Sequence, residues 1–186
     1  MKKNLTKIVL DLGCGLEKLK AQKNEKVIGV DYIKTKAVDK IHNLESPLPF
    51  PDNFADRIYS NHTFEHIANA KSLIEECWRI TKAKAEIFIR VPHYSHNSMY
   101  TDLTHKTFFS SRSLDYYIDG NELEKMSGYN PKVRFKMIKK KIVFDLPYKI
   151  LEPIVNINDK TRKAYEWFFC WIFPAREIEF KLSPTK

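Results

Sequence analysis

The sequence predicts an α/β fold with a mostly parallel sheet. Continuous apolar runs at 8–10 and 27–30 have the character of strands that are covered on both faces. Apolar runs of this kind alternate along the chain with segments of helical periodicity, which is typical of parallel sheets. The chain has 186 residues, of which 43% are apolar and 30% charged, so we expect one globular domain spanning 1–186.

Each element is predicted from periodicity and turn residues, in chain order. Strands are expected over 8–10, 27–30, 37–42, 56–60, 85–91, 133–144 and 177–182. A helix is expected over 69–80, because Leu73, Cys77 and Ile80 share one face and Asn69 is a suitable N-cap. A short helix within 111–117 and a strongly apolar helix over 161–173 complete the pattern. The segment from 92 to about 128 is polar, and such a segment after a central strand is typical of a functional loop.

The bulk composition indicates a protein of the cytoplasm. No apolar run approaches the roughly 20 residues that span a bilayer, and the first residues lack a signal-peptide core. The three cysteines fit neither a zinc nor a disulfide spacing, so we expect reduced thiols. The net charge of +9 favours anionic partners, and nucleic acid is one of them.

The turn after the first strand carries the main functional signal. Asp11-Leu-Gly-Cys-Gly15 gives the pattern D-x-G-x-G, and Asp31 ends the second strand about 20 residues beyond Asp11. A carboxylate at that place can accept hydrogen bonds from a ribose diol. Lys18 stands where a dinucleotide fingerprint has its third glycine, which disfavours a pyrophosphate cofactor. The pattern therefore favours another adenosine-containing ligand at the carboxyl ends of parallel strands.

Four further motifs follow in order: Asp31, Pro47–Asp56, Ser60–Ile67 with its Glu-His-Ile ending, and Trp78–Lys82. Together with the glycine loop they resemble the class I S-adenosylmethionine (SAM) methyltransferases, of the small prokaryotic single-domain type, over residues 8–92. The resemblance implies a Rossmann-like sandwich whose seven-stranded sheet is mostly parallel, with an antiparallel last strand. It also implies S-adenosyl-L-methionine as the cofactor.

The resemblance assigns expected roles to individual residues. Asp11 should lie near the methionine amino group, the two glycines beneath the cofactor, and Asp31 on the ribose hydroxyls. Asn43 stands where the family often has Asp, so an amide would meet the adenine edge. The expected cofactor-binding residues are Asp11, Gly13, Cys14, Gly15, Asp31, Tyr32, Asn43, Leu44, Asn61 and His62.

The polar segment is expected to supply the acceptor pocket and to cover the cofactor. His93 and His105 are the preferred candidates for a general base, and His62 is a third catalytic candidate. His66 is interpreted as a satisfied structural histidine. The spacing of His93, His96 and His105 also invites a metal interpretation, but it is no tight signature, and we expect no metal.

The leading functional prediction is methyl transfer from SAM to a small or medium-sized acceptor, at oxygen or nitrogen. An RNA or protein acceptor is the first alternative, through the basic run from Arg134 to Lys141. That run is equally typical of an edge strand protected by lysines, which we slightly favour. A SAM-binding protein without transferase activity is the second alternative. For the apolar segment 165–173 we expect core burial, over a homodimer contact or a lipid surface.

Overall fold

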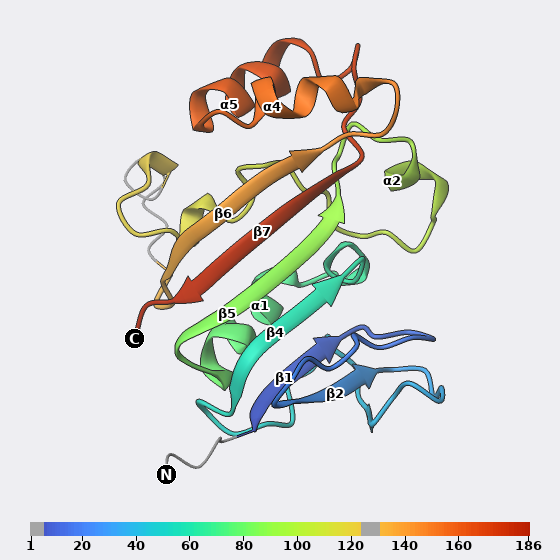
Figure 1. Ribbon diagram of the computed structural model, residues 1–186, viewed down its shortest axis with the longest axis vertical. Coiled ribbons are helices and arrows are strands. Elements are labelled where there is room, and N and C mark those ends of the chain that lie inside the picture. Colours follow the sequence, from blue (N-terminus) through green and yellow to red (C-terminus); the bar gives the residue numbers. More distant parts are fainter. Residues whose placement is uncertain (1–5, 124–130) are drawn as a thin grey trace.

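The structure, a computed structural model, describes residues 6–123 and 131–186. Its centre is a seven-stranded sheet in the order β3-β2-β1-β4-β5-β7-β6 (Figure 1). The strands β1 to β5 pair in parallel, whereas β7 runs antiparallel to both β5 and β6. The predicted fold class, with its antiparallel last strand, is confirmed. The strands are β1 Lys7–Leu12, β2 Glu25–Asp31, β3 Lys40–Ile41, β4 Ala55–Asn61, β5 Thr81–Pro92, β6 Phe135–Val143 and β7 Glu177–Pro184.

The helices are short apart from two. They are α1 Ala70–Ile80, α2 Ser98–Thr101, α4 Glu152–Val155 and α5 Asp159–Phe168, with 3-10 turns η1 Phe64–His66, η2 Asp115–Tyr117 and η3 Tyr148–Leu151. Two expectations are corrected in extent. The third strand is only two residues long, and the helix expected over 161–173 ends at Phe168. Residues 13–24 connect β1 to β2 without a helix.

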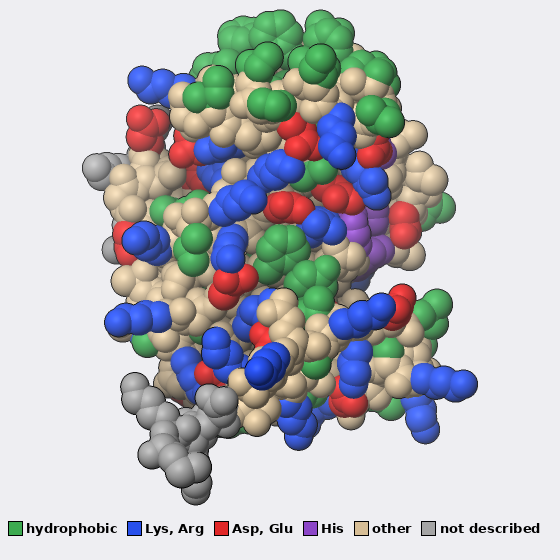
Figure 2. Space-filling view, viewed as in Figure 1, with side chains coloured by type: hydrophobic (Ala, Val, Ile, Leu, Met, Phe, Trp, Pro, Cys, Tyr) green, Lys and Arg blue, Asp and Glu red, His purple; other side chains and the backbone are tan. Residues whose placement is uncertain are grey.

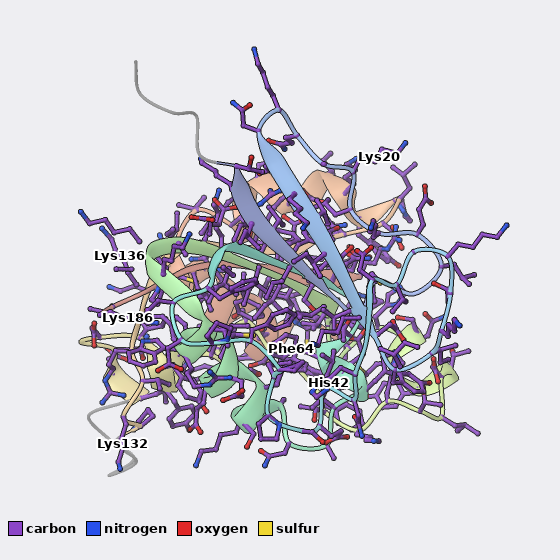
Figure 3. The ribbon with its side chains drawn as sticks, turned by 90° about the horizontal axis from the view of Figure 1, so that it is seen from below. Lys20, His42, Phe64, Lys132, Lys136 and Lys186 are labelled. Atoms are coloured by element: carbon purple, nitrogen blue, oxygen red, sulfur yellow. The ribbon has the colours of Figure 1, made fainter. Side chains whose placement is uncertain are left out.

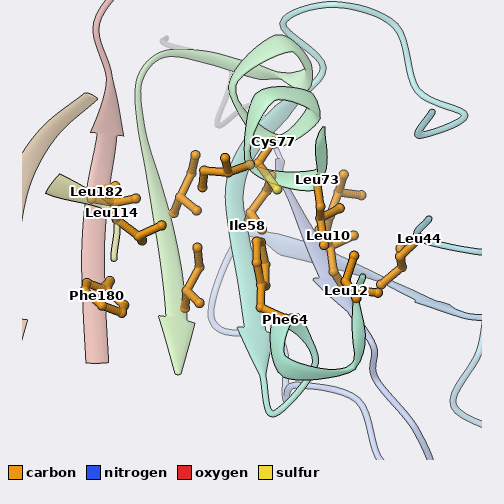
Figure 4. Close-up of a cluster of buried hydrophobic side chains, with 14 of the residues drawn as sticks. Leu10, Leu12, Leu44, Ile58, Phe64, Leu73, Cys77, Leu114, Phe180 and Leu182 are labelled. Carbon is orange, nitrogen blue, oxygen red and sulfur yellow. The ribbon is translucent and has the colours of Figure 1, made fainter. Parts of the chain in front are cut away.

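The main core lies between the sheet and α1 (Figure 4). Leu10 and Leu12 project from one face of β1, because alternate residues of a strand share a face, and they belong to the same buried cluster as Ile58 of β4. Leu73 and Cys77 of α1 pack onto this cluster at helical spacing. The helix begins as predicted, since the Asn69 side chain accepts a hydrogen bond from the Ser72 N–H at 3.1 Å.

The opposite face of β4, β5 and β7 carries half-exposed side chains. Tyr59 stacks on Phe88 with ring centroids 5.3 Å apart. Beside them Arg90 pairs with Glu179, and side chains of both charges gather over this face (Figure 2). Over these three strands the sheet is therefore fully covered on the α1 side only, which explains the alternation of apolar and charged residues in β7.

The lysine-rich strand is β6, and it lies at the edge of the sheet. This agrees with the interpretation of the basic run as an edge strand that lysines protect. The lysines that Figure 3 labels near this edge, Lys132 and Lys136, lie at the periphery of the molecule, whereas Phe64 lies near its middle. Lys140 is the exception: it is buried, with its Nζ 2.7 Å from Asp115 Oδ1. Lys141 pairs with Glu152.

A second, smaller core lies beyond the carboxyl end of β6, beneath α4 and α5 (Figure 1). Tyr165 and Cys170 are buried in it, but the apolar side chains between and after them point outward. Core burial of the segment 165–173 is therefore wrong as a general expectation. The small cluster offers room for only one side of α5 and of the turn that follows it, so large apolar side chains on the other side remain exposed: Trp167, Phe168, Phe169, Trp171 and Ile172.

Candidate functional site

Two adjoining cavities open at the carboxyl ends of the parallel strands. We call the first the glycine-loop cavity; it measures about 720 Å³. Seven of the expected cofactor-binding residues line it: Gly13, Gly15, Asp31, Tyr32, Asn43, Leu44 and His62. Its wall also contains Leu16, Ile33, Thr35, Glu45, Thr63, His66, Ile67, Thr104 and Lys106.

The two glycines of the loop have different roles. Both adopt positive φ, +74° at Gly13 and +56° at Gly15, which L side chains rarely tolerate. A Cβ on Gly13 would lie 2.1 Å from Thr63 Oγ1, so the missing side chain makes room for Thr63. A Cβ on Gly15 would meet nothing within 4 Å. Only Gly15 therefore leaves open space beside the cavity, whereas both glycines were expected to serve that purpose.

Asp31 ends β2 with its carboxylate fixed by the loop. Its Oδ2 accepts a hydrogen bond from the Gly15 N–H at 2.9 Å, and its Oδ1 accepts one from the Ile33 N–H at 3.0 Å. A carboxylate oxygen has more than one acceptor site, so both oxygens can still receive hydroxyl donors. The turn and the strand end thus fix this carboxylate at the wall of the cavity.

Three of the expected cofactor-binding residues, Asp11, Cys14 and Asn61, lie behind the wall and do not line the cavity. Asp11 Oδ2 accepts a hydrogen bond from the Leu19 N–H at 2.6 Å, and burial raises the pKa of this carboxyl group. Burial, aided by Asp11, raises the pKa of the Cys14 thiol to about 11. The Asn61 side chain accepts a hydrogen bond from Arg90 at 3.4 Å. Asp11 thus holds the segment that follows the glycines, whereas Asn61 is engaged with β5.

The second cavity, which we call the histidine cavity, measures about 1020 Å³. Three residues line both cavities: His62, His66 and Thr104. The rest of the histidine cavity is lined by Glu65, Pro92, His96, Ser98, Thr101, Asp102, Leu103, His105, Asp145, Arg176 and Glu177. A ligand in one cavity would therefore meet a ligand in the other at the end of β4.

His62 follows β4 and lies between two carboxylates. Its Nε2 is 3.0 Å from Glu177 Oε1, and its Nδ1 is 3.2 Å from Glu65 Oε1. The hydrogen bonds to Glu177 and then to Glu65 raise the pKa of His62 to about 9. The ring is therefore a cation at neutral pH with both N–H groups engaged. This arrangement contradicts the expectation that His62 serves as a general base.

The other two catalytic candidates, His93 and His105, lie in different environments. His93 is completely buried and lines neither cavity; its Nε2 is 3.3 Å from Glu166 Oε1 and its Nδ1 is 2.8 Å from Ser95 Oγ. His93 is thus separated from both cavities, because Glu166 of α5 packs against it at the end of β5. His105 does line the histidine cavity. His66, interpreted as structural, lies at the junction of the cavities.

Comparison with known protein families finds a match for the part of the chain that contains the glycine loop. The family model described as "Methyltransferase domain" matches residues 10–89, which run from within β1 to within β5 and include most of the residues that line the glycine-loop cavity. The match identifies residues 10–89 as a methyltransferase domain, and the fold is shared with SAM-dependent methyltransferases. SAM is accordingly the cofactor of this methyltransferase. No curated protein is found to match the chain.

Solved structures share the fold of this methyltransferase at low identity. A SAM-dependent methyltransferase from Archaeoglobus fulgidus is 20% identical with a TM-score of 0.54, covering 95% of this chain and 86% of its own. The YcgJ protein of Bacillus subtilis is 16% identical with a TM-score of 0.58, covering 97% and 92%. A chain from the complex between the Haloferax volcanii activator Trm112 and a methyltransferase is 15% identical with a TM-score of 0.58, covering 98% and 84%. At such identities the likeness shows the fold alone.

Several residues at the site of the methyltransferase were missed by sequence reasoning. Thr104 and Lys106 belong to the polar segment that was expected to cover the cofactor, and the Lys106 Nζ is 2.9 Å from Glu45 Oε1. Glu65 stands in the Glu-His-Ile motif, which could have indicated it. Arg176 and Glu177 reach the histidine cavity from the start of β7, and no local pattern announces them. Within the described residues no helix is both long and apolar enough to cross a membrane.

Proposed function

We propose that this methyltransferase holds SAM in the glycine-loop cavity and methylates a small or medium-sized acceptor, at oxygen or nitrogen, in the histidine cavity. The observation that supports this is the junction of the two cavities at His62, His66 and Thr104. Both volumes are in the range of small-ligand sites. In our proposal the donor and the acceptor approach each other at this junction.

The residues of the glycine-loop cavity fit SAM. Gly15 leaves space where a side chain would project, which suits close passage of a cofactor. We assign the ribose hydroxyls to Asp31, because its oxygens keep free acceptor sites at the wall. Tyr32 is exposed beside it and can flank the adenine, with Asn43 and Leu44 at the adenine edge.

When bound, SAM supplies a methyl group on a positively charged sulfur. Transfer of that methyl group to an acceptor lone pair would leave S-adenosylhomocysteine and would release the acceptor proton to solvent. The chain mainly has to position the acceptor for in-line attack. We assign positioning to the polar wall of the histidine cavity. His105 lines this cavity and contributes to that wall.

A small acceptor is favoured over a nucleic acid by the location of the basic run. That run lies on the edge strand β6, and two of its lysines, Lys140 and Lys141, are engaged by Asp115 and Glu152. The wall of the histidine cavity instead mixes both charges, with Arg176 beside Glu177 and Asp145. A mixed wall suits a compact polar molecule better than a phosphate backbone.

Replacement of Asp31 tests the assignment of the cofactor site. We expect Asp31→Ala to lower the affinity for SAM and for S-adenosylhomocysteine by at least about 30-fold, because charge-assisted hydrogen bonds are lost. Titration calorimetry measures the affinity, and circular dichroism checks the fold. Glu17→Gln is the matched control, since Glu17 is an exposed carboxylate of the same loop. Undiminished affinity in Asp31→Ala would contradict the assignment.

A further inference from the structure

Three potential metal ligands converge in the histidine cavity. One ligand atom each from Glu65, His66 and His105 lies within 4.8 Å of the other two. Glu65 is almost completely buried, and its Oε2 has no hydrogen-bond partner. An unpaired buried carboxylate oxygen is costly, and such a group is usually satisfied by a donor or a cation. The orphaned oxygen is therefore an independent indication that something binds here.

The hydrogen bonds behind the two histidines prepare one nitrogen of each ring. The His105 Nδ1–H donates to the Met99 carbonyl at 3.1 Å, so Nε2 is the ring nitrogen that this contact leaves for a ligand; it lies 3.9 Å from Asp102 Oδ2. Thr104 Oγ1 donates to Asp102 Oδ1 at 2.7 Å, so it must accept from His66 Nδ1 at 2.8 Å. His66 Nε2 is then the ring nitrogen that this contact leaves for a ligand. Partners of this kind are what orient the histidines of metal centres.

We infer that Glu65, His66 and His105 bind one divalent transition-metal ion at the junction of the two cavities. Two histidines and one carboxylate form a three-ligand set that leaves coordination positions open, as catalytic zinc sites and iron triads do. Tetrahedral ligands at about 2.1 Å from an ion are about 3.4 Å apart, so small side-chain rotations suffice. An open position would take the acceptor oxygen and lower its pKa. That role rests on the proposed function, whereas binding of the ion does not.

Titration with Zn²⁺ tests the site directly. Untagged protein is treated with a chelator, dialysed, and titrated with zinc chloride in a calorimeter. We expect one ion per chain, and affinities at least about tenfold weaker in Glu65→Gln and His105→Ala. His96→Ala is the matched control, because His96 lines the same cavity outside the triad. Binding of S-adenosylhomocysteine by each variant shows that it is folded.

The outcomes separate the ion from the transferase. Zinc binding that is unchanged in His105→Ala, or lost equally in His96→Ala, overturns the site. Protein that binds S-adenosylhomocysteine but no zinc also overturns it, while leaving the proposed cofactor site intact. If Asp31→Ala binds the cofactor as tightly as the wild type while zinc binding is retained, the proposed cofactor site is overturned and the zinc site is left intact.

A second, independent observation concerns the outer surface of α4 and α5. Nine large apolar side chains there are 49–83% exposed, and we call them the apolar cap: Leu146, Ile150, Ile154, Ile157, Trp167, Phe168, Phe169, Trp171 and Ile172. Figure 2 shows apolar side chains gathered over this end of the molecule. Soluble proteins rarely expose so large an apolar group unless it contacts a partner or a membrane.

The charges around the cap indicate the kind of partner. Its acidic neighbours are neutralised: Asp145 pairs with Arg176, Glu152 with Lys141, and Asp159 with Arg162. Lys149, Lys160 and Lys163, in contrast, make no ion pair within the described residues, and Lys163 lies over the Trp167 ring at 4.4 Å. Exposed tryptophans surrounded by unpaired lysines are typical of helices that lie at a membrane interface. A second copy of the chain would bring the same lysines toward each other.

We propose that the apolar cap binds the surface of an anionic membrane. Trp167 and Trp171 enter the headgroup region, and the lysines contact acidic headgroups. The supporting helix is well fixed, because Asn158 and Thr161 form a capping box at the start of α5. The cap lies at the same end of the molecule as the ends of β5 and β6, so the histidine cavity opens near it: Asp145 and Arg176 line that cavity and also the groove that contains Leu146 and Lys149.

Vesicle flotation tests this surface. We expect the protein to float with phosphatidylcholine vesicles containing about one-third phosphatidylglycerol, at least about tenfold more than with pure phosphatidylcholine. The double variant Trp167→Ser/Trp171→Ser should lose this binding, and Lys160→Glu/Lys163→Glu should weaken it. Ile41→Ser/Ile138→Ser is the control, because both residues are exposed far from the cap.

Sedimentation without vesicles distinguishes the competing partner. A dimer that dissociates in Trp167→Ser/Trp171→Ser, together with no vesicle binding by the wild type, overturns the proposal in favour of a homodimer. Flotation that is equal in the cap variant and in the control overturns it as well. A blue shift of tryptophan fluorescence on adding anionic vesicles, absent from the cap variant, supports it.

Discussion

At the scale of single residues, the glycine loop combines packing and ligand access in two glycines, Gly13 and Gly15. Gly13 makes room for Thr63, whose Oγ1–H donates to the Leu12 carbonyl at 3.1 Å and so joins the end of β1 to the end of β4. Gly15 has empty space beside it and donates its N–H to Asp31. The same residue type thus serves the stability of the fold at one position and the ligand at the other.

Alanine substitutions at the two glycines should separate these roles. Gly13→Ala combines a positive φ with overlap of Thr63, so we expect a loss of roughly 2–5 kcal/mol in the free energy of unfolding. Gly15→Ala suffers only the strain of positive φ, about 1–2 kcal/mol, but should weaken S-adenosylhomocysteine binding. Urea unfolding measures the first effect and calorimetry the second. Equal stabilities of the two variants would contradict this division of roles.

At the scale of elements, one arginine joins the end of α1 to the turn that precedes β4. The Arg79 guanidinium donates to the carbonyls of Leu48 and Phe50, each at 2.9 Å. Glu76, one turn earlier, pairs with Arg79 and accepts a hydrogen bond from the Leu48 N–H at 2.6 Å. The motifs Pro47–Asp56 and Trp78–Lys82 occur together because they are two halves of one contact.

Removal of this arginine should destabilise the fold in a pH-dependent way. We expect Arg79→Met to cost about 2–3 kcal/mol near pH 7, since the carbonyls of the turn and Glu76 lose a charged partner. Arg79 lowers the pKa of Glu76 below its usual 4.5, so this stabilisation is complete above pH 4.5 and is lost as the pH falls through the lowered value. Urea unfolding at neutral and acidic pH should show the gap between wild type and variant shrinking. Lys82→Met, which breaks an exposed pair with Asp56, should cost under about 1 kcal/mol.

Sequence periodicity predicted the elements better than it predicted the environment of each side chain. The strands and α1 follow from spacing and from Asn69, because a local pattern determines them. Local pattern could not show that Phe168 and Trp171 face outward, since apolar composition alone does not reveal how much core is available. It also could not place Glu177 beside His62, a contact across 115 residues. Nor could it show that His93 is buried whereas His105 lines a cavity, because these environments are created by tertiary contacts.

At the scale of the whole molecule, the sheet carries its functions at one end. The ends of β1, β2 and β4 form the glycine-loop cavity, and the segments after β5 and before β7 form the histidine cavity. The α4–α5 layer continues from the end of β6. The two hydrophobic cores are connected through the sheet, because Ile142 of the smaller core is paired in register with Ile178 of the main core. We therefore propose that the chain unfolds as one cooperative domain.

Scanning calorimetry with S-adenosylhomocysteine tests that cooperativity together with the cofactor site. We expect one transition, because β6 contributes to both cores and pairs with β7. Loss of the smaller core would therefore weaken the strand pairing on which the main core depends. Ligand at a hundredfold excess over its Kd stabilises the folded state by about 2.7 kcal/mol, which raises the Tm of a domain of this size by about 5–10 °C. Asp31→Ala should lose this rise, whereas Trp171→Ser should keep it, since the apolar cap lies outside the glycine-loop cavity. Two separate transitions, with only one of them moved by the ligand, would show that the α4–α5 layer unfolds independently of the methyltransferase sheet.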